Sequence, residues 1–121
     1  MSKRILVVED HEDNRRIMRD LFTSVGYEII EAMTGEEGVS QAETHIPDLI
    51  LMDIQLPGLD GYEATRRIKA NPALRHIPVI AVTSYALSGD DVKAFATGCD
   101  GYVSKPFSPR VLLAKVQEYL A

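Results

Sequence analysis

Short runs of apolar residues alternate along the chain with longer segments in which polar and apolar residues are mixed. The runs are rich in valine and isoleucine, and they lie at Ile5–Val8, Tyr27–Ile30, Leu49–Met52, Ile77–Val82 and Gly101–Val103. Short runs of this kind predict strands, and the segments between them are long enough to form helices. The pattern therefore predicts five strands connected by helices.

Two of the connecting segments carry a signal for the start of a helix. Thr34 stands three residues before Glu37, and Asp60 stands three residues before Glu63. At this spacing the first side chain accepts a hydrogen bond from the backbone of the glutamate. We expect helices to begin at these two places.

The first and last helices show an apolar stripe at helical spacing. In the first helix the expected buried residues are Ile17, Met18, Leu21, Phe22 and Val25, and Gly26 follows them as a left-handed cap. The last helix is expected to open at Ser108 and Pro109 and to bury Val111, Leu112, Val116 and Leu120. A further helix is expected from about Asp91 to Thr97, closed by Gly98.

Alternation of strands and helices predicts a parallel sheet with helices on both faces, because crossover connections are right-handed. Leu49–Met52 and Val79–Val82 are apolar throughout, as expected for central strands covered on both sides. The predicted fold class is α/β with a doubly wound sheet. A chain of 121 residues fits one compact domain, so we expect a single domain over residues 1–121.

Composition narrows the possible functions. The formal charge of -5 disfavours nonspecific attraction to nucleic acid or to an anionic membrane. Cys99 is the only cysteine, which excludes an internal disulfide framework and favours a buried structural thiol. No apolar run has the length of a membrane span or the form of a secretory signal. We therefore expect a cytoplasmic protein with no membrane insertion and no direct contact with nucleic acid.

Charged or hydroxylated residues follow four of the five predicted strands. They are Glu9 and Asp10 after the first strand, Asp53 after the third, Thr83 and Ser84 after the fourth, and Lys105 after the fifth. Ligands of open α/β sheets bind beyond the carboxyl ends of the strands. The order of residues therefore predicts a site in which three carboxylates, a hydroxyl pair and a lysine share one rim.

Carboxylates crowded on one rim repel each other, and a divalent cation relieves the repulsion. Oxygen ligands without histidine or cysteine partners favour Mg²⁺, Mn²⁺ or Ca²⁺ over Zn²⁺, and a small number of protein ligands suits Mg²⁺. Glu9 and Asp10 are the expected metal ligands, and Asp53 is the expected nucleophile toward phosphorus. Lys105 and Thr83 would face the oxygens of a phosphoryl group.

Four segments together carry a family resemblance: Ile5–Asp10, Asp48–Gly58, Val82–Ser84 and Lys105–Phe107. In this order they resemble the motifs of the receiver domain of bacterial two-component response regulators, and the resemblance covers the whole chain. The segment from Pro47 to Ser108 is most similar to single-domain regulators of the DivK type. The resemblance implies a flavodoxin-like (βα)5 fold with strand order 2-1-3-4-5 and no output domain.

The resemblance also implies a set of site residues. Asp53 would be the phosphorylation site, with Glu9, Asp10, Asp53 and the backbone carbonyl of Gln55 as ligands of Mg²⁺, for which Mn²⁺ would be able to substitute. The residues that bind phosphate or take part in the switch would be Thr83, Ser84, Tyr102 and Lys105. Lys105–Pro106 is expected to be a cis peptide, and Gln55 and Tyr85 are expected to tune the lifetime of the phosphoaspartate.

The partners implied by the resemblance are a sensor histidine kinase or a histidine phosphotransfer protein as the phosphoryl donor, and a protein effector downstream. The effector would bind the surface of about Leu87 to Ala121, whose conformation would change on phosphorylation. Phosphorylation-dependent dimerisation stays open, as does the role of this chain as the receiver module of a hybrid histidine kinase.

Three other functions fit an α/β fold. A phosphatase of the haloacid dehalogenase type needs a second acid two residues after its nucleophile, and that position is Gln55 here. A flavodoxin-like carrier would place a flavin phosphate beside Glu9 and Asp10, which would repel it. An interaction module that works without phosphorylation would not need the full set of site residues. We therefore expect a phosphoacceptor protein rather than an enzyme.

Overall fold

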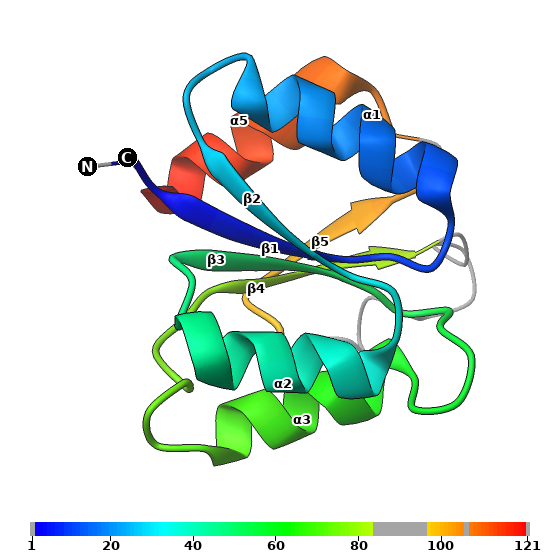
Figure 1. Ribbon diagram of the computed structural model, residues 1–121, viewed down its shortest axis with the longest axis vertical. Helices are drawn as coiled ribbons and strands as arrows, with labels where there is room; N and C mark the ends of the chain where they lie inside the picture. Colours follow the sequence, from blue (N-terminus) through cyan, green and yellow to red (C-terminus); the bar gives the residue numbers. More distant parts are fainter. Residues whose placement is uncertain (1, 84–96, 106, 121) are drawn as a thin grey trace.

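A five-stranded parallel sheet forms the middle layer of the molecule (Figure 1). The strands are β1 (Arg4–Val8), β2 (Glu28–Ala32), β3 (Leu49–Asp53), β4 (Val79–Thr83) and β5 (Gly101–Ser104), and their order in the sheet is β2-β1-β3-β4-β5. The computed structural model describes residues 2–83, 97–105 and 107–120. The predicted fold class, strand number and strand order are confirmed.

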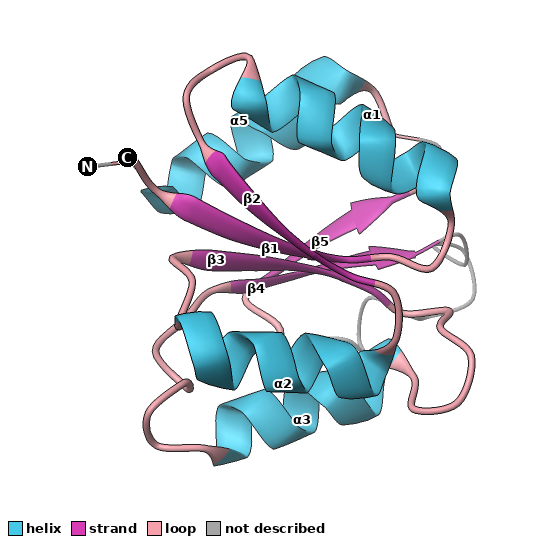
Figure 2. Cartoon of the chain, in the orientation of Figure 1, coloured by secondary structure: helices cyan, strands magenta, loops and turns pink. Residues whose placement is uncertain are grey.

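Helices cover both faces of the sheet (Figure 2). On one face lie α1 (Glu12–Thr23) and α5 (Pro109–Leu120), and on the other lie α2 (Gly35–His45) and α3 (Gly61–Ala70). The helix expected from about Asp91 to Thr97 falls almost wholly outside the described residues. None of the helices within the described ranges is long and apolar enough to cross a membrane.

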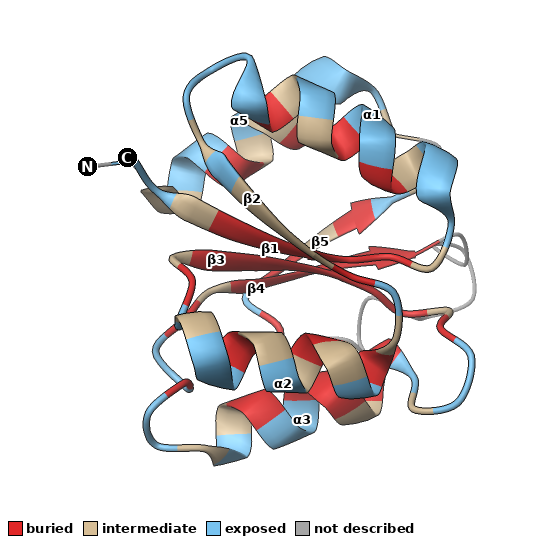
Figure 3. Ribbon diagram, in the orientation of Figure 1, coloured by how far each residue is buried: buried red, intermediate tan, exposed pale blue. Residues whose placement is uncertain are grey.

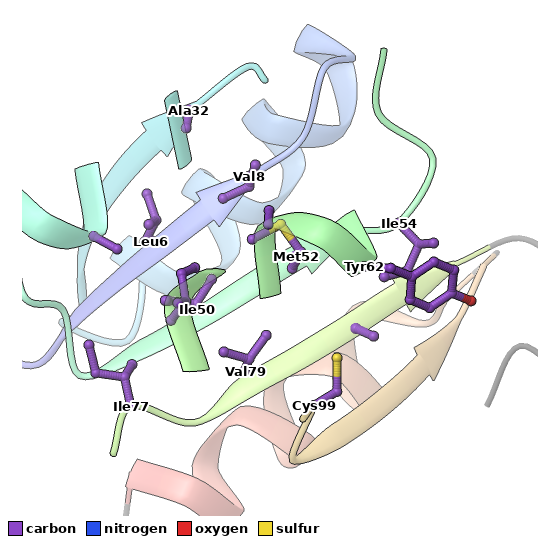
Figure 4. Packing of buried hydrophobic residues seen from close by; sticks show 14 of the residues in the cluster. Leu6, Val8, Ala32, Ile50, Met52, Ile54, Tyr62, Ile77, Val79 and Cys99 are labelled. Atoms are coloured by element: carbon purple, nitrogen blue, oxygen red, sulfur yellow. The ribbon is translucent and has the colours of Figure 1, made fainter. Parts of the chain in front are cut away.

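The core has two halves because side chains of a strand alternate between the faces of the sheet. Leu6 and Val8 of β1 pack in the cluster under α2 and α3 (Figure 4), whereas Ile5 and Val7 pack in the cluster under α1 and α5. All residues of β3 and β4 are buried (Figure 3), as expected for central strands. Cys99 is buried in the first cluster, as predicted.

The order of the strands creates a switch point at the carboxyl ends of β1 and β3. The chain runs from β1 outward to β2 and then returns to β3 on the other side of β1. Connections therefore leave β1 and β3 toward opposite faces, with α1 above the sheet and α3 below it in Figure 1. The crevice between such connections is where open α/β sheets bind their ligands.

Both predicted helix starts are confirmed. Thr34 Oγ1 accepts a hydrogen bond of 3.1 Å from the Glu37 backbone at the start of α2. Asp60 Oδ1 accepts one of 2.9 Å from the Glu63 backbone at the start of α3. The Glu37 side chain also accepts a hydrogen bond from the backbone of Met33, the residue before the N-cap, so it ties the start of α2 to the preceding loop.

The predicted apolar stripes are wrong at three positions. Ile17 in α1 and Val111 in α5 are 47% and 58% exposed, and Val25 is also exposed because α1 already ends at Thr23. The buried face of α1 consists of Arg15, Met18 and Phe22, and that of α5 consists of Leu112 and Val116. Helical spacing locates an apolar face, but the neighbouring elements decide which of its residues are covered. Gly26 has the expected left-handed backbone, with φ of 94°, and α5 begins at Pro109 as expected.

The capping hydrogen bond of α2 gives a test of the fold. Replacing Thr34 with alanine leaves the backbone N–H of Glu37 without its acceptor, and we expect the free energy of unfolding to fall by about 1 kcal/mol. Ser40→Ala, at an exposed position in the same helix, is the control and should leave stability unchanged or raise it by about 0.5 kcal/mol at most, because alanine has the higher helix propensity. Urea denaturation followed by circular dichroism measures both variants, and equal effects of the two would contradict the capping assignment.

Candidate functional site

Glu9, Asp53 and Lys105 meet at the carboxyl end of the sheet. Glu9 directly follows β1, Asp53 is the last residue of β3, and Lys105 follows β5. Gly61, the first residue of α3, lies against the backbone of Asp53, where a Cβ atom would collide with the Asp53 carbonyl oxygen. The ends of three strands and one tightly packed helix start therefore fix the geometry of this site.

The ammonium group of Lys105 lies between the two buried carboxylates. Its Nζ atom is 2.9 Å from Glu9 Oε1 and 3.1 Å from Asp53 Oδ2. The exposed fractions of these carboxylate side chains are 1% and 3%, so solvent screens the contacts weakly. The Lys105 backbone N–H donates a hydrogen bond of 2.7 Å to the Thr83 carbonyl oxygen, which fixes the start of the lysine side chain beside β4.

The two carboxylates differ in their affinity for a proton. Burial and the neighbouring Glu9 raise the pKa of Asp53 to about 6, against the opposing effects of Lys105 and the Gln55 backbone N–H. Burial also acts to raise the pKa of Glu9, but hydrogen bonds from Lys105, Asp53 and the His11 backbone outweigh it and lower that pKa to about 2. One lysine cannot fully compensate two buried charges, so Asp53 is the carboxyl that takes up a proton first.

A network on α1 holds Glu9 in place. The Glu9 side chain accepts hydrogen bonds from the His11 backbone at 3.1 Å and from Asn14 Nδ2 at 3.3 Å. The buried guanidinium of Arg15 donates to the Glu9 carbonyl oxygen at 2.9 Å and lies 3.4 Å from the Glu31 carboxylate on β2. Arg15 was not among the predicted site residues, although its place three residues before Met18 puts it on the buried face of α1.

Asp10 lies beside Glu9 with an oxygen atom that suits a cation. Its Oδ1 atom is buried and makes no hydrogen bond within the described part of the chain, and it lies 3.3 Å from Nδ1 of the exposed His11. Ligand atoms of Glu9, Asp10 and His11 all lie within 4.8 Å of one another. A buried carboxylate oxygen without a donor is costly, and a hard divalent cation would satisfy it.

Gln55 connects the carboxyl end of β3 with that of β4. Its backbone N–H donates a hydrogen bond of 3.0 Å to Asp53 Oδ1, and its side-chain Nε2 donates one of 2.7 Å to Thr83 Oγ1. Thr83 is completely buried. The sequence showed that the two residues follow neighbouring strands but not that their side chains bond, because this contact depends on the rotamer of the glutamine.

Tyr102 lies on β5 and is half-buried, packed against the cluster under α2 and α3. Its partner in the sheet register is Ala81, two residues before Thr83 on β4. Because side chains alternate along a strand, Tyr102 and Thr83 extend from the same face of the sheet on adjacent strands. Ser84, Tyr85 and Pro106 lie outside the described residues, and with Pro106 so does the expected cis peptide.

The site thus combines a buried carboxylate with an adjacent acidic pair, an ammonium group and a buried hydroxyl. An aspartate in these surroundings can attack an electrophilic phosphorus atom. The ammonium group and a cation held by the acidic pair would then neutralise charge on the phosphoryl oxygens. The arrangement suits transfer of a phosphoryl group to a carboxylate better than binding of a neutral ligand.

Comparison with known proteins agrees with this chemistry. The family model for the response regulator receiver domain matches residues 5–117. The polar-differentiation response regulator DivK of Brucella ovis is 46% identical over 120 residues, which cover 99% of this chain and 98% of that protein. DivK of Brucella anthropi is also 46% identical, with the same coverage.

Solved structures show the same fold. The receiver domain of the sensor histidine kinase PA1611 of Pseudomonas aeruginosa PAO1 was solved with a magnesium ion coordinated in its active-site cleft, and it is 38% identical to this chain. It aligns with a TM-score of 0.92 over 99% of this chain and 98% of its own. A receiver domain of a histidine kinase of Syntrophus aciditrophicus is 33% identical, with a TM-score of 0.91 over 98% and 90% of the two chains.

The raised pKa of Asp53 makes a prediction about stability. The folded state binds the proton of Asp53 more tightly than the unfolded state does. The protonated Asp53 side chain therefore contributes fully to the free energy of unfolding below about pH 4, and this contribution is lost as pH rises through about 6. Asp53→Asn removes the buried negative charge. In metal-free buffer we expect this variant to be more stable than the wild type by on the order of 2 kcal/mol at about pH 7.5, with the difference shrinking toward pH 4.

Urea denaturation across this pH range, with a chelator present, measures the difference. Asp20→Asn, at an exposed carboxylate on α1, is the control and should change stability by less than about 0.5 kcal/mol throughout. A gap between Asp53→Asn and the wild type that stays constant with pH would contradict the cause assigned to the raised pKa.

Proposed function

The chain belongs to the response regulator receiver domain family, a family of phosphoacceptors in two-component signalling, and we propose that Asp53 is its acceptor. The observation that carries this proposal is the position of the Asp53 carboxylate. It is 3% exposed, it ends a central strand at the switch point of the sheet, and it lies 3.1 Å from the Lys105 ammonium. Glu9 and Asp10 lie on the neighbouring strand end and supply the acidic pair.

In the proposed reaction a carboxylate oxygen of Asp53 forms a bond to the phosphorus atom of a phosphohistidine. The bond between phosphorus and the histidine nitrogen of the donor breaks, and the electron pair returns to the imidazole. Attack requires the ionised carboxylate, and Lys105 favours ionisation of Asp53. Lys105 then neutralises charge on the phosphoryl group, as its ammonium already does for the carboxylate.

We propose Glu9, Asp10, Asp53 and the backbone carbonyl of Gln55 as the ligands of Mg²⁺. The buried Oδ1 of Asp10 without a hydrogen bond, together with the magnesium ion in the related Pseudomonas receiver domain, supports this assignment. When bound, the ion would neutralise negative charge on the transferred phosphoryl group. Mn²⁺ can replace it, since it accepts the same oxygen ligands.

Phosphorylation would act on the rest of the molecule through Thr83 and Tyr102. The Thr83 hydroxyl would move toward a phosphoryl oxygen, and Tyr102, on the same face of the adjacent strand, would turn into the space that it leaves. A shallow depression beside Tyr102 is lined by Phe107, Val111 and Lys115. Val111, exposed on α5, would then belong to the surface that binds the effector.

The family implies a histidine kinase as a partner, and we propose a sensor kinase or a histidine phosphotransfer protein as the immediate donor. The DivK relatives are response regulators that are matched over 98% of their length, and we propose the role of a response regulator for this chain. With a net charge of -5, the chain is poorly suited to bind nucleic acid directly, so the effector is proposed to be a protein.

Beryllofluoride tests the proposal because it imitates a phosphoryl group on a carboxylate. With Mg²⁺ present, we expect it to shift the ¹H–¹⁵N NMR signals of residues around Thr83 and Lys105 in the wild type. Asp53→Asn should show no such shifts. Asp60→Asn, at the N-terminus of α3, is the matched control and should respond like the wild type, because asparagine also caps a helix.

An unchanged wild-type spectrum would reject the receiver mechanism for this chain. Equal responses of Asp53→Asn and the wild type would show that a different residue is the acceptor.

A further inference from the structure

We propose that Gln55 is a positioning residue that holds the Thr83 hydroxyl away from the phosphoryl site in the unphosphorylated protein. This inference rests on the proposed function of Asp53 and extends it to the control of the same site. The Gln55 side chain thereby favours the resting state, and its removal favours the state with a phosphoryl group or an analogue on Asp53.

The geometry around Gln55 supports the proposal. The residue contacts the acceptor through its backbone, at 3.0 Å from Asp53 Oδ1, and the switch hydroxyl through its side chain, at 2.7 Å from Thr83 Oγ1. The first bond spans two positions at the end of β3, and the second joins residues 28 positions apart at the ends of the neighbouring strands β3 and β4. One residue therefore contacts both groups that phosphorylation is proposed to bring together.

The peptide backbone on either side of this contact is fixed. Ile54 donates a hydrogen bond to the Val82 carbonyl oxygen at 3.0 Å, and its own carbonyl oxygen accepts from Leu56 and Gly61 at 3.1 Å each. The Gln55 backbone therefore cannot readily follow Thr83 if that residue moves.

Thr83 is anchored through its main chain as well. Its carbonyl oxygen accepts a hydrogen bond of 2.7 Å from the Lys105 backbone. Because this residue is completely buried, its hydroxyl cannot replace a lost partner with bulk water. To reach a phosphoryl oxygen, the Thr83 hydroxyl must therefore break its hydrogen bond with the Gln55 amide. The free energy lost with that bond opposes activation.

The size of the effect follows from the chemistry of the bond. A hydrogen bond between two neutral groups contributes modestly to an equilibrium, which corresponds to a change of about two- to tenfold in a binding constant. Gln55→Met keeps most of the volume of the side chain and removes the donor. We expect it to bind beryllofluoride about two- to tenfold more tightly than the wild type at saturating Mg²⁺.

The Mg²⁺ affinity of Gln55→Met should stay within about twofold of the wild-type value, because the proposed metal ligand is the backbone carbonyl, which the substitution retains. Binding of beryllofluoride involves no hydrolysis, so an effect of residue 55 on the attacking water does not influence the measurement. Gln55→Ala provides a second variant without the amide and should change affinity in the same direction.

Two controls separate positioning from a general effect on the fold. In a Thr83→Ala background the substitution Gln55→Met should have no effect on beryllofluoride affinity, because the hydroxyl that Gln55 holds is absent. Gln41→Met, at a partly buried glutamine on α2, should leave the affinity of the wild type unchanged.

Unchanged or weaker binding by both Gln55 variants would overturn the inference, and so would equal tightening with and without the Thr83 hydroxyl. If the wild type binds beryllofluoride and Asp53→Asn does not, these outcomes for the Gln55 variants reject only the role of Gln55 and leave the proposed function of Asp53 standing. If the wild type itself does not bind beryllofluoride, the proposed function fails together with this inference.

Discussion

The contact of the Lys105 ammonium with the carboxylates of Glu9 and Asp53 is the interaction on which the site depends. These residues lie 96 and 52 positions apart from the lysine in sequence, and only the order of strands in the sheet brings them together. Two carboxylates buried side by side would repel each other strongly without a cation. The position of Lys105 after β5 therefore makes the acidic crevice at the switch point compatible with a stable fold.

The Lys105 ammonium compensates the negative charge of the two carboxylates only in part, and the remaining negative charge suits the proposed chemistry. One ammonium group serves two buried carboxylates, so Asp53 is left with a raised pKa and Asp10 with a buried oxygen that makes no hydrogen bond in the described part of the chain. A divalent cation would stabilise these carboxylates by neutralising their remaining charge. Its positive charge would then also be available to the oxygens of a phosphoryl group. The lack of a second positive charge is consistent with both the metal requirement and the acceptor role of Asp53 that we propose.

Much of this arrangement followed from the sequence because it depends on short-range patterns. Apolar runs gave the strands, and the residues directly after them gave the rim that contains Glu9, Asp53 and Lys105. Strand order entered through the family resemblance, since periodicity alone does not determine it. Contacts that depend on side-chain packing were not predicted. Helical spacing puts Arg15 on the buried face of α1, but its hydrogen bond to the Glu9 carbonyl oxygen and the bond of Gln55 to Thr83 depend on rotamers that no local pattern specifies.

The most direct test of the account is chemical identification of the phosphorylated residue. After incubation with acetyl phosphate and Mg²⁺, reduction with borohydride converts an acyl phosphate of aspartate to homoserine, which mass spectrometry of proteolytic peptides locates. The account predicts homoserine at position 53, with formation abolished by omission of the metal. Modification at Glu9 or Asp10 instead, or equal modification without a divalent cation, would contradict it.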